Sequence, residues 1–265
     1  SYLDAIYSDL YRRDHMPIDV VISPEKEVAS AALQRLSAPA AFDTEVFMNG
    51  QAHLMGITIE EECPVVNTPL RQLTDLFSTL RATVVAVRRE GTLFAPEAKD
   101  QLFVGDACYV FTHVEDIPRT LEIFGKKVTK QERVVLVGGG NVGLTVAQTL
   151  EARAKRVRAK VIEKNRICAE RAAEALERTI VLNGDGLDAG LLAEAGISRA
   201  DAMLAITDDD KTNMLACVRA KAEGCPYTIA LINDPTLVPL MTPLGIAAYI
   251  TPRATTVSSI LRHLR

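Results

Sequence analysis

The second half of the chain alternates short runs of aliphatic and β-branched residues with longer stretches of helical periodicity. This alternation is typical of a parallel sheet whose strands are joined by crossover helices. Six such units predict an α/β fold, with a doubly wound parallel-sheet (Rossmann) domain over residues 126–265. The strands are expected at residues 133–137, 158–162, 179–182, 202–206, 228–231 and 247–250, and the helices at 141–154, 166–178, 187–195, 209–223, 235–242 and 254–264.

Residues 39–125 follow a different pattern. Two alternating segments, 43–48 and 53–58, flank Asn49-Gly50, a dipeptide that favours a tight hairpin turn, so we expect an antiparallel pair there. The other elements expected are a helix at 69–80 with leucines on one face, strands at 83–88 and 107–112 with a turn at Gly91 between them, and a helix at 115–124. The Rossmann domain is therefore expected to be preceded by a small α+β module.

The chain contains an internal repeat. Val-Val-Ile-Ser-Pro, ending at Pro24, and Ala-Tyr-Ile-Thr-Pro, ending at Pro252, stand 228 residues apart, and an amphipathic helix follows each. Leucines keep the same register in both copies, at Leu33 and Leu36 and at Leu261 and Leu264. Chance recurrence of a common junction is the alternative. If the repeat arose by duplication, residues 1–38 are expected to be the tail and crossover helix of a first Rossmann domain. The front of that domain, and a second small module after residue 265, are then expected to lie outside this sequence.

Composition narrows the function classes. With 48% hydrophobic and 24% charged residues the chain is an ordinary globular protein, and its net charge of −4 argues against a dedicated nucleic-acid binder. Five cysteines without a CxxC pair indicate neither a zinc ribbon nor a disulfide framework, and they fit a reducing cytosol. The longest apolar runs have the length of strands, so no membrane-spanning helix is expected.

A glycine-rich turn is the clearest functional motif. The first expected strand runs into Gly138-Gly139-Gly140-Asn141-Val142-Gly143, a GxGxxG pattern that opens a helix. Gly138 permits the tight turn, Gly140 lets a pyrophosphate approach the backbone, and Gly143 allows close packing of helix on strand. The N–H groups that open the helix, near Asn141 and Val142, then face the phosphates. The alternative is a strand-to-helix turn whose glycines serve packing alone and bind no nucleotide.

Glu163 stands twenty residues beyond Gly143, at the end of the next expected strand. A carboxylate there accepts hydrogen bonds from the adenosine ribose and repels a 2′-phosphate, which favours NAD(H) over the phosphorylated cofactor. A solvated strand end is the alternative. Arg166 lies close by and could either stack on adenine or attract a 2′-phosphate.

Two further polar segments end strands at the same edge of the sheet, where doubly wound folds bind ligands. Asp185 either contacts adenine or ribose or belongs to an ordinary turn. Asp208 is expected to cap the helix that follows it, and Asn213 inside that helix is equally open to both kinds of role.

No catalytic or metal-binding group is predicted. The sequence lacks HExxH, GxSxG and GxxxxGK[ST] patterns, and no nucleophile stands near a base. The four histidines fall away from the expected carboxyl edge of the sheet: His15, His53, His113 and His263.

These motifs occur together with a Thr-x-Asp-Asp segment at Thr207 and the repeated Ser/Thr-Pro helix. With them the chain resembles the Trk-type potassium-uptake regulatory (TrkA) family over essentially all of its length. Members carry two repeats, each a nucleotide-binding RCK (or KTN) domain plus a small carboxyl-terminal module. The resemblance implies domains at 1–38, 39–125 and 126–265. It also implies phosphate binding by Gly138, Gly140 and Gly143, ribose binding by Glu163, adenosine contact by Asp185, and Thr207 and Asn213 near the nucleotide.

The resemblance implies regulation and not catalysis. NAD or NADH, with ATP or ADP as alternatives, would shift the conformation of a homo-oligomeric gating ring. The partner would be a membrane potassium-translocating subunit, which places the protein in the cytoplasm, peripheral to the inner face of the cell membrane. Gly186 and Asn233-Asp234 depart from family patterns in a way that does not favour ATP. An NAD-dependent oxidoreductase and an assembly scaffold with a vestigial pocket are the competing hypotheses.

Two apolar stripes predict helix pairing between copies. One is formed by Val28, Ala29, Ala32, Leu33 and Leu36, and its counterpart by Val257, Ile260, Leu261 and Leu264. Burial of each stripe within its own domain is the alternative.

Overall fold

The structure is a computed structural model that describes residues 22–37, 41, 43–126, 131–153, 156–246 and 248–263. The chain divides into two compact units. One unit combines the described parts of Ser1–Ala32 and Arg133–Arg265, and the other is Leu33–Glu132. His15, the first residues of the amino-terminal repeat copy (Val20 and Val21) and Leu264 lie outside the described residues.

The first unit contains a six-stranded parallel sheet in the order β11-β10-β9-β6-β7-β8. Its strands are β6 (Arg133–Val137), β7 (Arg158–Glu163), β8 (Ile180–Asn183), β9 (Ala202–Ala205), β10 (Thr228–Leu231) and β11 (Ala248–Ile250). Its main helices are α1 (Pro24–Ser37, of which residues up to Ala32 belong to this unit), α4 (Asn141–Arg153), α5 (Arg166–Ala175), α6 (Ala189–Ala195), α7 (Asp210–Ala222) and α8 (Pro252–His263). The predicted Rossmann fold is confirmed.

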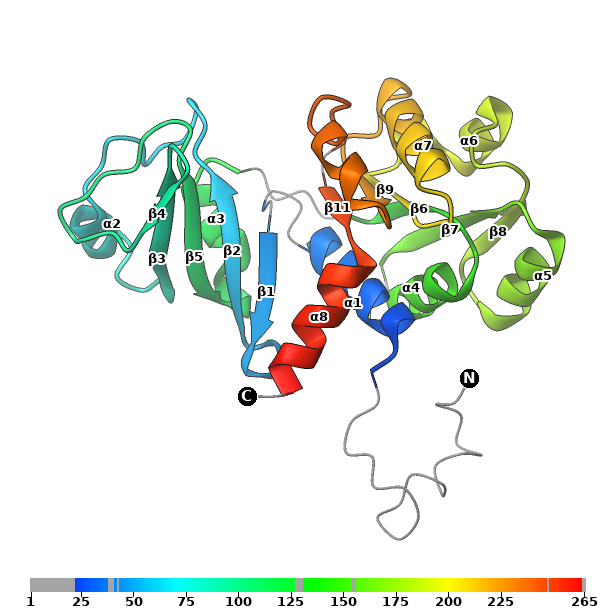
Figure 1. Cartoon of the computed structure of the whole chain (residues 1–265), viewed down its shortest axis with the longest axis horizontal. Helices are drawn as coiled ribbons and strands as arrows, with labels where there is room; N and C mark the ends of the chain where they lie inside the picture. Colours follow the sequence, from blue (N-terminus) through cyan, green and yellow to red (C-terminus); the bar gives the residue numbers. More distant parts are fainter. Residues whose placement is uncertain are drawn as a thin grey trace, which may run out of the picture. The chain divides into compact units, whose positions relative to one another are not determined.

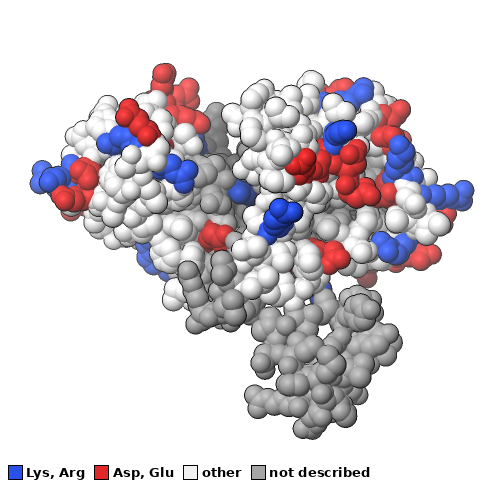
Figure 2. Space-filling model, viewed as in Figure 1, with Lys and Arg blue, Asp and Glu red and all other residues white. Residues whose placement is uncertain are grey.

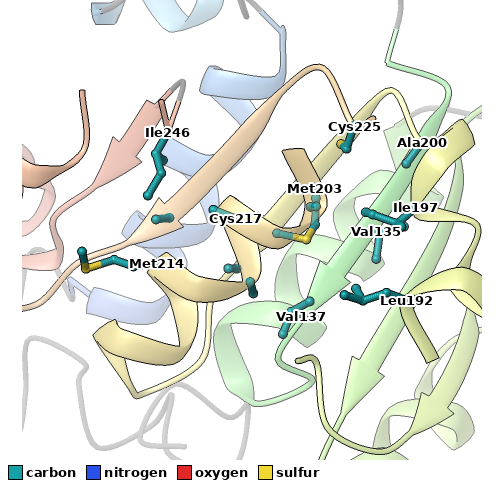
Figure 3. Close-up of a cluster of buried hydrophobic side chains, with 14 of the residues drawn as sticks. Val135, Val137, Leu192, Ile197, Ala200, Met203, Met214, Cys217, Cys225 and Ile246 are labelled. Carbon is teal, nitrogen blue, oxygen red and sulfur yellow. The ribbon is translucent and has the colours of Figure 1, made fainter. Parts of the chain in front are cut away.

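The central strands are buried on both faces. Every residue of β9 and β10 is buried, as are four of the five residues of β6, because helices cover the sheet on both sides (Figure 1). Figure 3 shows part of the resulting core, where Val135 and Met203 from the sheet lie near Leu192, Ile197 and Cys217. Since strand order reverses between β6 and β9, the segments that follow these two paired strands run in opposite directions and leave a crevice at the carboxyl edge of the sheet.

Several helix boundaries in this unit differ from expectation. The segment expected as a helix at 235–242 is a 3-10 helix, Pro235–Leu240, with Pro239 inside it. Helix α5 ends at Ala175 because the next backbone N–H groups bind a side chain instead: those of residues 177–179 donate to the Glu151 carboxylate at 2.6 to 3.2 Å. Helix α8 begins at Pro252, which confirms proline in its first turn.

The second unit is an antiparallel sheet in the order β1-β2-β5-β3-β4, which confirms the small α+β module. Its strands are β1 (Asp43–Phe47), β2 (Ala52–Thr58), β3 (Ala82–Arg89), β4 (Thr92–Phe94) and β5 (Ala107–His113), and its helices α2 (Leu70–Leu76) and α3 (Ile117–Ile123). The β1–β2 hairpin was predicted, but its connection is a 3-10 turn, Met48–Gly50, with Met48 in the left-handed region at φ 52°.

Two features of this unit were missed or misjudged. Strand β4 follows a two-residue turn in which Glu90 and Gly91 both have positive φ. Helix α2 ends four residues before the expected position, at Leu76, and Leu76 is exposed and not part of a buried face. Within the described part of the chain, no helix combines the length and apolar character that crossing a bilayer requires.

The two apolar stripes have different environments. Val28, Ala29 and Ala32 of α1 are buried within the chain, whereas Val257 and Ile260 of α8 are exposed. The stripe on α1 is therefore already covered, as the alternative to helix pairing between copies expected. The pairing of α8 with another copy stays a prediction.

Candidate nucleotide-binding site

A cavity of about 930 Å³ opens at the carboxyl edge of the parallel sheet. Residues after β6, β7, β8, β9 and β10 line it, together with the first turns of α1. Seven of the eight binding residues predicted from the sequence line this cavity: Gly138, Gly140, Asn141, Val142, Glu163, Asp185 and Thr207. The eighth, Gly143, is not among the lining residues.

The three glycines of the motif differ in what a side chain at their position would contact. Gly138 has φ of 111°, and a Cβ there would lie 2.8 Å from the Ile206 carbonyl oxygen. A Cβ on Gly143 would overlap the Gly138 carbonyl oxygen, so this glycine serves the close packing of α4. A Cβ on Gly140 would meet no atom within 4 Å and would project into open space beside the cavity. Only Gly140 is therefore free of a steric constraint within the protein itself.

Helix α4 begins at Asn141 directly after this turn. The first N–H groups of an α-helix have no acceptor within the helix, and the helix dipole places partial positive charge at this end. The residues that open α4 line the cavity. This end of the cavity can therefore hold a phosphate or another anion.

The Glu163 carboxylate binds the glycine-rich turn. Its Oε2 accepts a hydrogen bond from the Gly139 N–H at 2.5 Å, and its Oε1 accepts one from the Asn165 N–H at 2.7 Å. Neither contact was predicted: the one to Gly139 depends on how β7 lies beside β6, and the one to Asn165 belongs to the local turn after β7. A carboxylate has about four lone-pair positions, so acceptor capacity remains for a ligand hydroxyl in the cavity.

Asp185 is paired with Lys164 at the cavity rim. The Lys164 Nζ donates to Asp185 Oδ2 at 2.8 Å, and the Leu187 N–H donates to Oδ1 at 2.9 Å. Lys164 is the main cause that lowers the pKa of the Asp185 carboxyl and keeps it charged. Lys164 was not predicted, although its place next to Glu163 was the available signal.

Thr207 and Asn213 form one hydrogen-bonded unit. Asn213 Oδ1 accepts from the Thr207 N–H and hydroxyl at 2.9 and 2.7 Å, and its Nδ2 donates to the Thr207 and Leu231 carbonyls at 3.0 and 2.9 Å. Asn213 is fully buried and is not a cavity-lining residue. It ties the ends of β9 and β10 together, and thereby positions Thr207 at the cavity.

The predicted helix cap was assigned to the wrong aspartate. Asp209, not Asp208, caps α7, because its carboxylate accepts from the N–H groups of Lys211 and Thr212 at 3.3 and 3.0 Å. Asp208 is exposed and lines the cavity. Asp210 accepts four hydrogen bonds from Asn233 and Asp234, at 2.8 to 3.0 Å, which fixes the loop after β10.

Several cavity residues were not predicted. They come from α1 (Pro24, Glu25 and Val28), from the start of α5 (Asn165 and Cys168) and from the start of α8 (Pro252). The repeated Ser/Thr-Pro junction was the signal for Pro24 and Pro252, but the sequence gave no sign that both copies would reach one cavity. Arg166, considered for adenine or a 2′-phosphate, is not a lining residue and pairs with Glu170 at 2.8 Å.

The cavity lining is acidic. It contains the carboxylates of Glu25, Glu163, Asp185, Asp208 and Asp209, and Lys164 is its one basic residue among those described. No group of three His, Cys, Asp or Glu side chains in the described residues is arranged to hold a metal ion. Over the face seen in Figure 2, acidic and basic side chains are interspersed.

Comparison with known proteins identifies both units. The TrkA-N domain family matches residues 134–252, and the TrkA-C domain family matches residues 54–125. The chain is 46% identical to a Trk system potassium uptake protein TrkA from Azorhizobium caulinodans, over 100% of this chain and 58% of that protein. The chain thus spans little more than half the length of the curated relatives it matches.

Solved structures share the fold. The RCK domain of GsuK superposes with a TM-score of 0.61 at 16% identity, covering 97% of this chain and 54% of the other. The GsuK channel bound to NAD gives 0.61 at 17% identity, covering 98% and 45%. With a TrkA-C domain followed by a TrkA-N domain and with this sequence identity, the chain belongs to the TrkA family of Trk potassium-uptake proteins.

Proposed function

We propose that this chain is a nucleotide-binding regulatory part of a potassium uptake system and that NAD(H) binds in the cavity at the carboxyl edge of the parallel sheet. The observation that carries the proposal is the convergence of the open start of α4, the unobstructed Gly140 and the Glu163 carboxylate on one cavity. Membership of the TrkA family and the NAD-bound state of a structural relative support it.

The residues assign a role to each part of the ligand. The N–H groups near Asn141 and Val142 would hold the pyrophosphate, with Gly140 giving it access and Gly138 and Gly143 shaping the turn. Glu163 would bind the adenosine ribose, and Asp185, at the rim of the cavity, would contact adenine or ribose. Thr207 would lie near the nucleotide on the opposite side of the start of α4. A volume of about 930 Å³ lies within the range typical of ligand pockets, roughly 300 to 1,000 Å³.

The proposed role is regulation. The described cavity-lining residues include no histidine and one cysteine, Cys168, whose backbone N–H donates to the Asn165 side chain. Hydride transfer needs substrate groups beside the nicotinamide, and the one basic side chain of the described lining, Lys164, is already paired with Asp185. A bound nucleotide would act by favouring one arrangement of a homo-oligomeric ring, to the extent that it binds that arrangement better.

The domain roles follow from this proposal. Residues 39–125 would be a TrkA-C module, 126–265 an RCK nucleotide-binding domain, and residues 1–38 the crossover segment of a preceding repeat, equivalent to α8. The partner would be a membrane potassium-translocating subunit at the inner face of the cell membrane. The repeated Ser/Thr-Pro junctions at the start of α1 and α8 support this assignment.

Thermal unfolding with NAD, NADH, NADPH, ATP and ADP tests the proposal, with Gly140→Ala as the decisive variant. The added methyl group meets no protein atom within 4 Å but would occupy space that the pyrophosphate needs. We expect an unchanged midpoint without ligand. NADH at about 100 times its dissociation constant should stabilise the native chain by about 2.7 kcal/mol, and the variant should lose this shift.

The matched control is Gly190→Ala, which adds the same methyl group on α6 outside the cavity. It should keep the full ligand-induced shift. Absorbance at 340 nm, followed after a panel of carbonyl compounds is added as hydride acceptors, separates the two functions, because an oxidoreductase consumes NADH with its acceptor whereas a sensor leaves NADH intact with all of them. A ligand shift that survives in Gly140→Ala would contradict the proposed site.

A further inference from the structure

A second cavity, of about 270 Å³, lies within the α+β unit beside helix α2. Its lining is mostly apolar and comes from α2 and the residues after it, from β3 and β5, from the segment 96–98 and from the end of α3. Two of the lining residues, Val110 and Phe124, are buried core residues. Protein interiors are close-packed and contain few voids larger than a water molecule. An apolar cavity of this size therefore indicates a binding site for an apolar ligand.

Helix α2 is attached at both ends but does not fill the space beside it. None of its seven residues is buried, and its leucines are at least partly exposed. At its start, the N–H groups of Leu70 and Arg71 donate to backbone carbonyls of the segment 98–100 at 3.0 and 2.8 Å. Beyond its end, the Thr79 hydroxyl oxygen accepts a hydrogen bond from the Arg119 guanidinium of α3 at 3.1 Å. These contacts at both ends oppose a collapse of α2 into the cavity.

The charged side chains of the lining favour an anionic group on the ligand. Arg71 and Glu97 are the two charged residues of the described lining. Glu97 is already paired, because the Lys99 Nζ lies 2.8 Å from its Oε2. The Arg71 guanidinium has no ion-pair partner among the described residues. A guanidinium presents its N–H donors in a planar fork that matches the two oxygens of a carboxylate. The cavity thus combines an apolar volume with one unpaired cation.

We propose that this cavity binds a small apolar carboxylate, with its hydrocarbon part among Leu73, Phe77 and Val84 and its carboxylate at the Arg71 guanidinium. An engineered cavity of about 150 Å³ in another protein binds benzene. The larger volume here admits a ligand with a longer apolar body, such as octanoate. The ligand would complete the packing of α2 against its own unit. This site belongs to a different unit from the proposed nucleotide site and does not depend on it.

Titration calorimetry of the full chain with octanoate, and with octanol as its uncharged counterpart, tests this proposal. We expect both probes to bind the original chain. Arg71→Gln should weaken octanoate binding about fivefold, the upper end of what an exposed ion pair contributes, and should leave octanol binding unchanged. The matched control is Arg199→Gln, which makes the same charge change at an exposed position in the other unit and should leave both affinities unchanged.

A second variant tests the cavity itself. Ala82 lines the cavity from β3, so Ala82→Leu should fill part of it and abolish binding of both probes. Ala86→Leu makes the same change on the same strand outside the lining and should keep both affinities. If neither probe binds the original chain, or if octanoate binds Ala82→Leu as tightly, the cavity is not the site. Equal losses of octanoate and octanol in Arg71→Gln would contradict the carboxylate assignment, and this comparison decides it even if Ala82→Leu fails to fold.

Discussion

The two units of the chain use their polar side chains in opposite ways. In the α+β unit a buried carboxylate is fully paired within the protein. Asp106 is 2% exposed and accepts from Arg89 at 2.7 and 2.8 Å and from the Phe103 N–H at 2.9 Å, and Arg89 also lies over the Phe103 ring. In the Rossmann unit, the carboxylates of Glu163 and Asp208 face an open cavity. Polar groups that satisfy one another stabilise a fold, whereas groups with unused capacity at a cavity can bind a ligand.

The largest predicted effect on stability lies within the glycine-rich turn. Gly143→Ala should cost about 3 kcal/mol of unfolding free energy, because the methyl group overlaps the Gly138 carbonyl oxygen and α4 must move. Gly140→Ala, three residues earlier, should cost almost nothing. Urea denaturation of both variants without ligand measures the difference. Equal midpoints for the two variants would show that the turn relaxes freely, and that close packing of α4 is not the reason for glycine at 143.

A second prediction concerns the ion pair between Arg89 and the buried Asp106. Asp106→Asn should destabilise the chain by about 2 kcal/mol, because Arg89 loses a charged acceptor that is buried. The exposed pair of the other unit provides the control: Asp185→Asn removes the partner of Lys164 and should cost less than about 1 kcal/mol. The same denaturation experiment measures both, and a larger loss for Asp185→Asn would reverse the comparison.

Acid should also weaken the contact between Asp106 and Arg89. Arg89 is the main cause that lowers the pKa of Asp106 in the folded chain. The stabilisation from this carboxylate is therefore fully present above the unfolded pKa, near 3.9, and is lost as the pH falls through the lower folded value.

The smallest predicted effect lies at His53 on β2. His53 is buried, its Nδ1 has no hydrogen-bond partner among the described residues, and burial lowers its pKa. The unfolded chain therefore binds a proton more readily, so stability should fall as the pH drops through about 6.5 toward the folded pKa. His53→Leu should flatten this part of the stability profile. An unchanged slope would assign the pH dependence to other groups.

Local sequence was sufficient wherever structure depends on neighbours in the chain. The strands of the parallel sheet were predicted closely because each is a short apolar run buried on both faces. The glycine-rich turn was predicted because Gly138 needs a positive φ and Gly143 needs close approach, and both requirements are met only by glycine.

Features that depend on contacts between distant segments were missed. Nothing near Glu25 in the sequence indicates that α1 reaches a cavity formed by residues after 133. The choice between Asp208 and Asp209 as the cap of α7 depends on where the backbone turns into the helix, and adjacent aspartates give the same sequence signal. Asn213 was left open because its four hydrogen bonds join the ends of two strands that are neighbours only in the folded sheet.

Gly186 departs from the pattern of the TrkA family, and its packing limits which substitutions its position can accept in related sequences. A Cβ at 186 would overlap Cγ1 of the buried Val137, a stiff β-branched side chain at the end of β6. The two positions can therefore change only together: a relative with alanine at the position of Gly186 should have a smaller residue at that of Val137. Covariation between these two positions would show that both side chains share one limited volume beneath the candidate nucleotide-binding cavity.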